Sequence, residues 1–254
     1  MVEKDRGIRT VEDVMALLDG LFAPGADRWS RGGAGWWDGF YADRERPVPF
    51  FVAKPDENLV SYVERGLLPE GGAGVRRALD LGCGPGRNAL YLASLGYTVD
   101  AVDLSPTAID WARDRAREAG LADRIRFVCG NAFTAPELGA DGPYDLVYDS
   151  GCFHHLPPHR RVTHLALLDR VLAPGGHFAL TAFAAGEGGM GSELPDAAFY
   201  RKGTLEGGLA YTDTALRAIF SPMTATELRR MRHQPPASPH FGEPFLWTAL
   251  FHRA

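Results

Sequence analysis

Cysteine is scarce in this chain, and its three cysteines are far apart. Cys83, Cys129 and Cys152 are an odd number and contain no C-x-x-C pair. This spacing predicts neither a disulfide framework nor a zinc knuckle, and it favours a reducing compartment. A chain of 254 residues also buries enough surface to fold without either. We therefore expect the fold to depend on an ordinary apolar core.

The sequence also lacks a long apolar run and an excess of positive charge. No uninterrupted apolar stretch approaches the roughly 20 residues of a membrane helix, and residues 1–25 mix charged and apolar side chains, unlike a secretory signal. The formal net charge of −5 creates no field that attracts a polyanion. These features predict a cytoplasmic protein without a membrane or nucleic-acid partner, and they leave the oligomeric state open.

A front section precedes the main part of the chain. Apolar residues recur at helical spacing over residues 10–22, and residues 57–64 form a second expected helix that Gly66 closes. Residues 28–51 are rich in glycine and aromatic side chains and follow neither period. They predict an ordered loop whose rings cover another part of the protein. Residues 69–74 break the chain before the core.

Strand-like and helix-like segments alternate after this break. Strands are expected at 75–81, 98–103, 126–129, 145–149 and 177–183, and helices at 88–95, 106–119 and 159–172. This alternation predicts right-handed crossovers and a parallel sheet. After a helix at 212–220, strands at 224–231 and 245–252 should pair antiparallel because no helix fits between them. We expect a single domain with a cap at 1–70, a core at 75–183, an insertion at 184–210 and a C-terminal helix and strand pair at 211–254.

A glycine-rich turn joins the first core strand to the next helix. It reads Asp80-Leu81-Gly82-Cys83-Gly84-Pro85-Gly86-Arg87-Asn88, and open α/β sheets bind ligands at such turns. A dinucleotide fingerprint, G-x-G-x-x-G, needs glycine where Arg87 stands. The pattern G-x-G-x-G behind the acidic Asp80 instead suits a ligand that brings its own positive charge.

These residues resemble the first motif of the class I S-adenosylmethionine-dependent methyltransferases, an acidic residue followed by G-x-G-x-G. The resemblance covers about residues 78–183. It implies S-adenosylmethionine as cofactor, and it implies an α/β Rossmann-like sheet of seven strands in the order 3-2-1-4-5-7-6. The last strand would be antiparallel, with helices on both faces of the sheet and an N-terminal helical cap.

The same resemblance assigns cofactor contacts. It implies that Asp80 lies near the amino group of the cofactor, that Asp103 binds the two ribose hydroxyls, and that Asn131 and the backbone of Ala132 bind the adenine. The expected cofactor-binding residues are Asp80, Gly82, Cys83, Gly84, Gly86, Arg87, Asn88, Asp103, Leu104, Asn131, Ala132, Asp149 and Ser150.

The motif after the fourth strand indicates the kind of acceptor. It begins Asp149-Ser150-Gly151-Cys152 and continues to His154 and His155, so it departs from the Asn/Asp-Pro-Pro-Tyr/Phe motif of nucleic-acid base methyltransferases. Together with the aromatic front section, it resembles the small-molecule branch near the thiopurine and heterocyclic-toxin methyltransferases. This implies methyl transfer to sulfur, nitrogen or oxygen of a small molecule. The alternatives are a cofactor-binding protein without methyl transfer, and a methyltransferase that acts on RNA or protein.

Three titratable residues are candidates for proton transfer at the reacting centre. They are Asp149, His154 and His155, because a neutral imidazole can accept a proton from a thiol, an amine or a phenol. Alternatively, the histidines pack in the fold with one ring nitrogen bonded to the backbone. The sequence does not decide whether a base is used. A metal site is not expected, because Pro157 and Pro158 separate the nearby histidines and no carboxylate pair accompanies them.

Aromatic residues of the front section are candidates for the acceptor site. Aromatic faces favour a sulfonium, and rings that close on the site exclude water. The alternative for about half of them is packing within the cap. The expected substrate-binding residues are Trp37, Phe40, Tyr41, Phe50, Phe51 and His154.

Overall fold

The structure, a computed structural model, describes residues 7–68 and 76–254. It contains a seven-stranded sheet in the order β3-β2-β1-β4-β5-β7-β6. Strands β1 to β5 are parallel, and β7 runs antiparallel to both of its neighbours. The predicted Rossmann-like fold and strand order are confirmed. The strands are β1 Arg77–Leu81, β2 Thr98–Asp103, β3 Ile125–Cys129, β4 Tyr144–Ser150, β5 Leu172–Phe183, β6 Thr224–Arg230 and β7 Leu246–His252.

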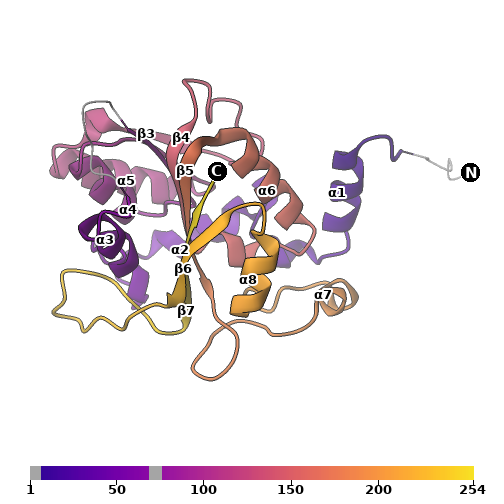
Figure 1. The fold of residues 1–254 in the computed structure, drawn as a ribbon. Helices are drawn as coiled ribbons and strands as arrows, with labels where there is room; N and C mark the ends of the chain where they lie inside the picture. The colour runs from indigo at the N-terminus through magenta and orange to yellow at the C-terminus, as the bar shows by residue number, and fades with distance from the viewer. Residues whose placement is uncertain (1–6, 69–75) are drawn as a thin grey trace, which may run out of the picture.

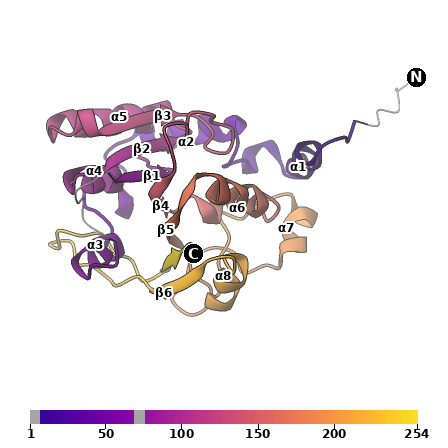
Figure 2. The same cartoon turned by 45° about the horizontal axis from the view of Figure 1, so that its top comes forward.

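Helices cover both faces of this sheet. Figure 1 shows α4 and α5 on one side and α6 and α8 on the other, and Figure 2 gives the same arrangement from a second direction. No helix within the described ranges is both long and apolar enough to cross a membrane. The helices are α1 Val11–Asp19, α2 Ala34–Ala42, α3 Glu57–Glu64, α4 Arg87–Ser94, α5 Pro106–Glu118, α6 Arg160–Val171, α7 Asp196–Lys202 and α8 Asp213–Ile219.

The apolar core lies in two layers, one on each face of the sheet. Side chains of a strand alternate between its faces. In β4, Leu146 and Tyr148 therefore join the cluster around Leu92 of α4, while Val147 joins the cluster around Leu168 of α6. The central strands are buried from both sides, as expected for a parallel sheet. This rigid frame holds the carboxyl ends of β1, β2 and β4 in fixed positions.

The expectation that residues 28–51 form a loop is wrong. This stretch contains α2 and short 3-10 turns at Arg31–Gly33 and Pro49–Phe51. Within α2, Trp36 stacks on Phe40 and Trp37 stacks on Tyr41, which are pairs at the i, i+4 spacing of a helix. Asp38 and Gly39, which lie between these rings, also favour turns, so the sequence alone does not identify the helix.

The start of β5 also differs from the expectation. The sequence predicts this strand at 177–183, but β5 already begins at Leu172 and includes the Pro-Gly-Gly sequence at 174–176. The pairing of β4 with β5 shifts register between Tyr144 and Leu146, so this irregularity accommodates the extra residues. The insertion holds one helix, α7, that the sequence did not predict. The expected break at 69–74, and Val75 at the start of the first strand, lie outside the described residues.

Candidate functional site

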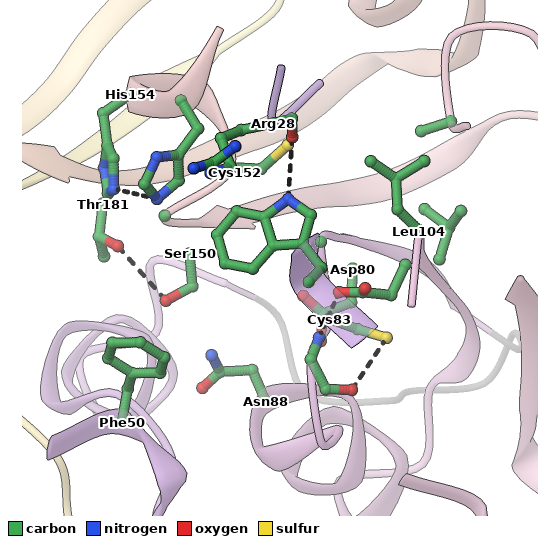
Figure 3. Close-up of a pocket in the computed structure, with 18 of the residues that line it drawn as sticks. Arg28, Phe50, Asp80, Cys83, Asn88, Leu104, Ser150, Cys152, His154 and Thr181 are labelled. Atoms are coloured by element: carbon green, nitrogen blue, oxygen red, sulfur yellow. Dashed lines mark hydrogen bonds between the residues drawn. The ribbon is translucent and has the colours of Figure 1, made fainter. Parts of the chain in front are cut away.

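A large cavity lies at the carboxyl ends of β1, β2 and β4. Its volume is about 300 Å³. In Figure 3, Asp80, Cys83 and Leu104 lie on one side of it, and Phe50, Ser150, His154 and Thr181 lie on the other. Sixteen of the residues expected at the site line this cavity: Trp37, Tyr41, Phe50, Asp80, Gly82, Cys83, Gly84, Arg87, Asn88, Asp103, Leu104, Asn131, Ala132, Ser150, His154 and His155.

Four of the expected site residues are not among those that line the cavity. Gly86 packs against α5, where an added Cβ would be 3.0 Å from the Cβ of Ala112. Phe40 and Phe51 pack in a cluster with Trp111 of α5. Asp149 is fully buried beneath the loop that follows β4. These four residues support the walls of the cavity from behind.

Asp80 places a buried carboxyl group in the cavity without a complete set of partners. Its side chain is 1% exposed, and its Oδ2 accepts no hydrogen bond from any described residue. Burial, with the negative charge of Asp56 as a further cause, raises the pKa of Asp80 to about 8. A buried carboxylate without a counter-ion is unstable, so this site favours a ligand with a positively charged group.

Asp103 joins the glycine-rich turn to the start of α5. Its Oδ2 accepts a hydrogen bond from the backbone N–H of Gly84, and its Oδ1 accepts one from the backbone N–H of Ser105, both at 2.9 Å. Burial raises the pKa of Asp103 above its usual value. Each carboxylate oxygen can accept more than one hydrogen bond. The carboxylate is therefore fixed in place and still able to accept bonds from a ligand.

Two glycines of the turn allow close approach of other side chains. Gly82 has a φ of +65° and Gly84 a φ of +51°, which residues with a Cβ rarely adopt. A Cβ at position 82 would be 3.0 Å from the Cβ of Cys152, and one at position 84 would be 3.0 Å from the hydroxyl of Tyr41. The turn thus brings bare backbone to the wall of the cavity.

We expect Gly84→Ala to destabilise the protein by about 1–3 kcal/mol, because it adds backbone strain and a contact with Tyr41. Urea unfolding measures this loss. The double variant G84A/Y41F removes the hydroxyl that the new methyl group touches. It should recover the part of the stability loss that comes from the contact with the hydroxyl, and it should keep the part that comes from backbone strain at the positive φ of residue 84. Equal stability of the two variants would show that the hydroxyl contact contributes nothing.

A network of hydrogen bonds around Asp56 supports the floor of the cavity beside Asn88. Asp56 is fully buried, and its Oδ2 accepts hydrogen bonds from the hydroxyls of Tyr148 and Ser150, each at 2.6 Å. Its Oδ1 lies 2.6 Å from Nη1 of Arg87, and the guanidinium stacks over the ring of Phe241 at 4.1 Å. Arg87, which excludes a dinucleotide motif, is thereby neutralised within the protein.

Sequence reasoning missed Asp56 because its position suggests another role. An aspartate directly before a helix normally caps that helix. Here Asp56 is the N-cap residue of α3, but its side chain makes no capping hydrogen bond. It turns toward the cavity floor instead. No local pattern in the sequence distinguishes these two orientations, so only the packed fold reveals the network.

His154 and His155 form a buried pair in the cavity wall. Their Nε2 atoms are 3.2 Å apart, and Nδ1 of His154 accepts a hydrogen bond from the backbone N–H of Phe183 at 3.3 Å. Burial lowers the pKa of His154 well below its usual value and lowers the pKa of His155 to about 4. Both rings are therefore neutral at pH 7.

Asp149 anchors the loop that carries this pair. Its Oδ1 accepts hydrogen bonds from the backbone N–H groups of Cys152 at 2.8 Å and Phe153 at 3.1 Å. Its Oδ2 lies 3.1 Å from Nε2 of His164, and both side chains are fully buried. Asp149 is thus placed to orient the loop rather than to touch a ligand in the cavity.

The N-terminal section closes the side of the cavity near Asn131. Trp29 lines the cavity, and its indole Nε1 donates a hydrogen bond to Asp19 of α1 at 2.8 Å. Asp19 also contacts Nε2 of His159 at 2.8 Å and forms an ion pair with Arg160. Oδ1 of Asn131 accepts a hydrogen bond from the backbone N–H of Phe133. This wall therefore depends on contacts between α1 and the start of α6.

Several lining residues were not predicted at all. They come from the N-terminal section, from the end of β5 and from the segments after it, and their sequence surroundings carry no motif. Within residues 7–68 and 76–254, no group of three potential metal ligands is close enough to hold an ion. The unpredicted residues that line the cavity include Arg28, Trp29, Thr181, Phe183, Met190 and Phe241.

The strand order and the cavity at the strand ends define a Rossmann-like α/β protein. Comparison with known families matches residues 78–176 to the family described as "Methyltransferase domain". An uncharacterized methyltransferase of Schizosaccharomyces pombe is 36% identical over 125 residues, which are 49% of this chain and 79% of that protein. The 2-heptyl-1-hydroxyquinolin-4(1H)-one methyltransferase of Mycobacteroides abscessus is 32% identical over 136 residues, 53% of this chain and 56% of the other.

Solved structures agree with these matches. A structure from work on the conversion of a disulfide bond into a thioacetal group during echinomycin biosynthesis has a TM-score of 0.64 and 25% identity, and it covers 87% of this chain and 92% of that one. Further structures with the same fold contain bound S-adenosylhomocysteine. The chain spans about half, or less, of the length of the first curated relatives it matches. The chain belongs to the class I S-adenosylmethionine-dependent methyltransferases.

Proposed function

We propose that this enzyme transfers the methyl group of S-adenosylmethionine to a sulfur, nitrogen or oxygen atom of a small molecule. One observation carries the proposal. A single cavity is lined both by the incompletely bonded carboxyl of Asp80 and by apolar side chains, which include Phe50, Phe183, Met190 and Phe241. Such a concave and largely apolar lining suits a small molecule better than a polymer strand.

The residues around Asp80 in the cavity fit the methyl donor. We propose that Asp80 binds its ammonium group, that Asp103 accepts hydrogen bonds from its ribose hydroxyls, and that Asn131 and the backbone of Ala132 face its adenine. The backbone N–H of Ala132 makes no hydrogen bond with another residue in the described part of the chain. When bound, the donor supplies an electrophilic methyl group on a positively charged sulfur.

The binding role of Asp80 predicts a pH effect on affinity for S-adenosylhomocysteine. The pKa of about 8 in the free protein should fall when an ammonium binds, because opposite charge favours the carboxylate. Binding near pH 7 should therefore release a proton, and affinity should weaken by up to about tenfold per pH unit below pH 8. Calorimetry in buffers of different ionisation enthalpy measures the proton. The variant Asp80→Asn should bind S-adenosylhomocysteine more weakly and release a smaller fraction of a proton. Equal proton release in the variant and the wild type would contradict the assignment.

Two relatives support a small acceptor. The matched protein of Mycobacteroides abscessus is named for a hydroxyquinolinone, and the matched structure comes from work on a disulfide in echinomycin biosynthesis. We propose a small-molecule acceptor here, and we propose that the cap at 1–70 and the insertion at 184–210 complete its binding site around the core at 75–183. The strand pair at 211–254 extends the sheet of the same domain. The free cysteines among the described residues fit a reducing, cytoplasmic location.

The proposed function is tested by measuring S-adenosylhomocysteine formation with a panel of thiols, amines and phenols. Turnover of at least one class of small acceptor is expected. Tight cofactor binding without turnover of any acceptor would favour a protein that only binds the cofactor. Methylation of RNA or protein alone would favour the other alternative, and RNA binding would then fall steeply with salt.

A further inference from the structure

Three charged side chains are buried close together beside the glycine-rich turn. Asp56 and Asp80 are the carboxylates, and Arg87 is the cation. A buried charge is costly unless a group of opposite charge lies next to it. One guanidinium cannot balance two carboxylates. The partner that Arg87 takes therefore decides which carboxyl group stays available to a ligand.

Arg87 takes Asp56 as its partner. Its Nη1 lies 2.6 Å from Oδ1 of Asp56, and neither atom has a hydrogen bond to any other described residue. Its Nη2 donates to the hydroxyl of Ser150 at 3.2 Å. Among residues 7–68 and 76–254, no ion pair joins Arg87 to Asp80. The guanidinium is thus held on the Asp56 side, and Oδ2 of Asp80 is left without a partner.

The carboxylate of Asp56 has a fixed position because several segments hold it. Its backbone N–H donates to Oδ1 of Asn88 at 3.0 Å, and its Oδ2 accepts from Nδ2 of Asn88 at 3.1 Å. The hydroxyls of Tyr148 and Ser150 donate to the same Oδ2, and the backbone pairs with Phe241 in an isolated β-bridge. These bonds occupy Oδ2 and hold Oδ1 where the guanidinium meets it.

The charges of this pair act on Asp80. Burial raises the pKa of Asp80, the charge of Asp56 raises it further, and the charge of Arg87 lowers it. Asp149 also raises this pKa, but hydrogen bonds of the loop after β4 occupy its carboxylate. On the same side of the cavity (Figure 3), the thiol of Cys83 is neutral because burial raises its pKa well above the usual value. A guanidinium released from Asp56 would therefore be attracted to Asp80.

We propose that Asp56 is a positioning residue: it pairs with Arg87 and so keeps the guanidinium from Asp80, which leaves the carboxyl group of Asp80 available to the ammonium group of the methyl donor. The inference rests on the role of Asp80 in the proposed function. The three side chains form a cluster that is one positive charge short, and the ammonium group supplies this charge. Without the carboxylate of Asp56, the guanidinium would pair with Asp80 and compete with the ligand.

The first experiment compares two ligands by calorimetry. Asp56→Asn keeps the shape of the side chain and removes its charge. This variant should bind S-adenosylhomocysteine at least about tenfold more weakly and release almost no proton at pH 7, because pairing with Arg87 keeps Asp80 ionised. Binding of 5′-deoxy-5′-methylthioadenosine should change by less than about twofold, because this ligand has the adenosine but no ammonium group.

Two results of this comparison would overturn the inference. Unchanged binding of S-adenosylhomocysteine in Asp56→Asn would show that the pair with Arg87 does not protect Asp80. Equal weakening of both ligands would show that the substitution damages the whole site. A circular dichroism spectrum like that of the wild type confirms that the variant is folded.

The matched rescue is the double variant D56N/R87Q, which removes both charges of the pair. It should bind S-adenosylhomocysteine within about threefold of the wild type, because no guanidinium remains to pair with Asp80, and this recovery measures the coupling of the two residues. A double variant as weak as Asp56→Asn would contradict the proposed role. Arg87→Gln alone should bind as tightly as the wild type. A tenfold loss there would instead assign Arg87 to the carboxylate of the ligand and overturn the inference.

Proton release in Arg87→Gln gives a test that does not depend on the folding of Asp56→Asn. Since the pKa of Asp80 is about 8, the wild type should release about half a proton at pH 8 when S-adenosylhomocysteine binds. Arg87→Gln removes a charge that lowers this pKa, so it should release more. Equal release in the two proteins would show that Arg87 does not act on Asp80 and would overturn the inference.

Asp80→Asn separates this inference from the proposed function. If that variant bound S-adenosylhomocysteine as tightly as the wild type, the proposed role of Asp80 itself would be wrong. If it bound weakly while Asp56→Asn bound normally, only the role of Asp56 would be wrong. The absence of product from every acceptor would overturn methyl transfer and leave these binding results unaffected.

Discussion

Asp149→Ala is expected to lower the free energy of unfolding by about 3–5 kcal/mol, because it leaves several buried hydrogen-bond donors without their acceptor. The substitution leaves the backbone N–H groups of Cys152 and Phe153 without an acceptor and leaves His164 without its carboxylate. His164 lies among the rings of four phenylalanines and is fully buried. Urea unfolding of the folded variant measures the loss.

Two matched variants separate the parts of this effect. Asp149→Asn keeps an oxygen that can accept from the loop and should lose less than half as much stability. The double variant D149A/H164F also removes the imidazole that would lose its partner, but it still leaves the two backbone N–H groups of the loop without an acceptor. It should be more stable than Asp149→Ala alone. If all three variants were equally destabilised, the carboxylate–imidazole contact would not be the source of the loss.

Asp103→Ala is expected to weaken binding of S-adenosylmethionine by about 1.5–3 kcal/mol, or roughly 10- to 150-fold, because hydrogen bonds to a charged group are lost. Part of the loss comes from the turn, since Gly84 and Ser105 each donate a backbone hydrogen bond to this carboxylate. Calorimetry with the folded variant gives the affinity directly.

The control for this prediction is Asp103→Asn, which keeps one oxygen and nearly the same shape. It should bind better than Asp103→Ala and worse than the wild type. Unchanged affinity in Asp103→Ala would remove this residue from the cofactor site. A loss of affinity with an equally large loss of stability would instead assign Asp103 to the structure of the turn alone.

The sequence predicted the central fold well because its signals are local. Ser105 and Pro106 mark the start of α5, and the hydroxyl of Ser105 accepts the backbone N–H of Ala108 as a cap should. The glycine-rich turn likewise carries its spacing in the sequence itself. The same local reasoning failed for α2, whose Trp36 and Trp37 are held by ring contacts and by Asp38, which accepts hydrogen bonds from Ser105 and Thr107 of a distant segment.

The site was predictable where the chain follows the strand ends and unpredictable where distant segments meet there. Asp80 and Asp103 sit at positions that strand and turn patterns identify. Arg28 reaches the same cavity from the N-terminal section and Phe241 from the loop before β7. Nothing in the sequence around either residue indicates that destination, because the contact depends on how the whole sheet brings these segments together.

The pairing of β5 with β7 has a consequence for the synthesis of the protein. Five parallel strands are complete once residue 183 has been made, but β7, which covers the open edge of β5, begins only at Leu246. Until then, the apolar residues of β5 present unpaired backbone N–H and C=O groups to any other strand. A nascent chain that contains β5 but not yet β7 is therefore prone to aggregate through this edge. The risk ends when β7 has been synthesised and pairs with β5.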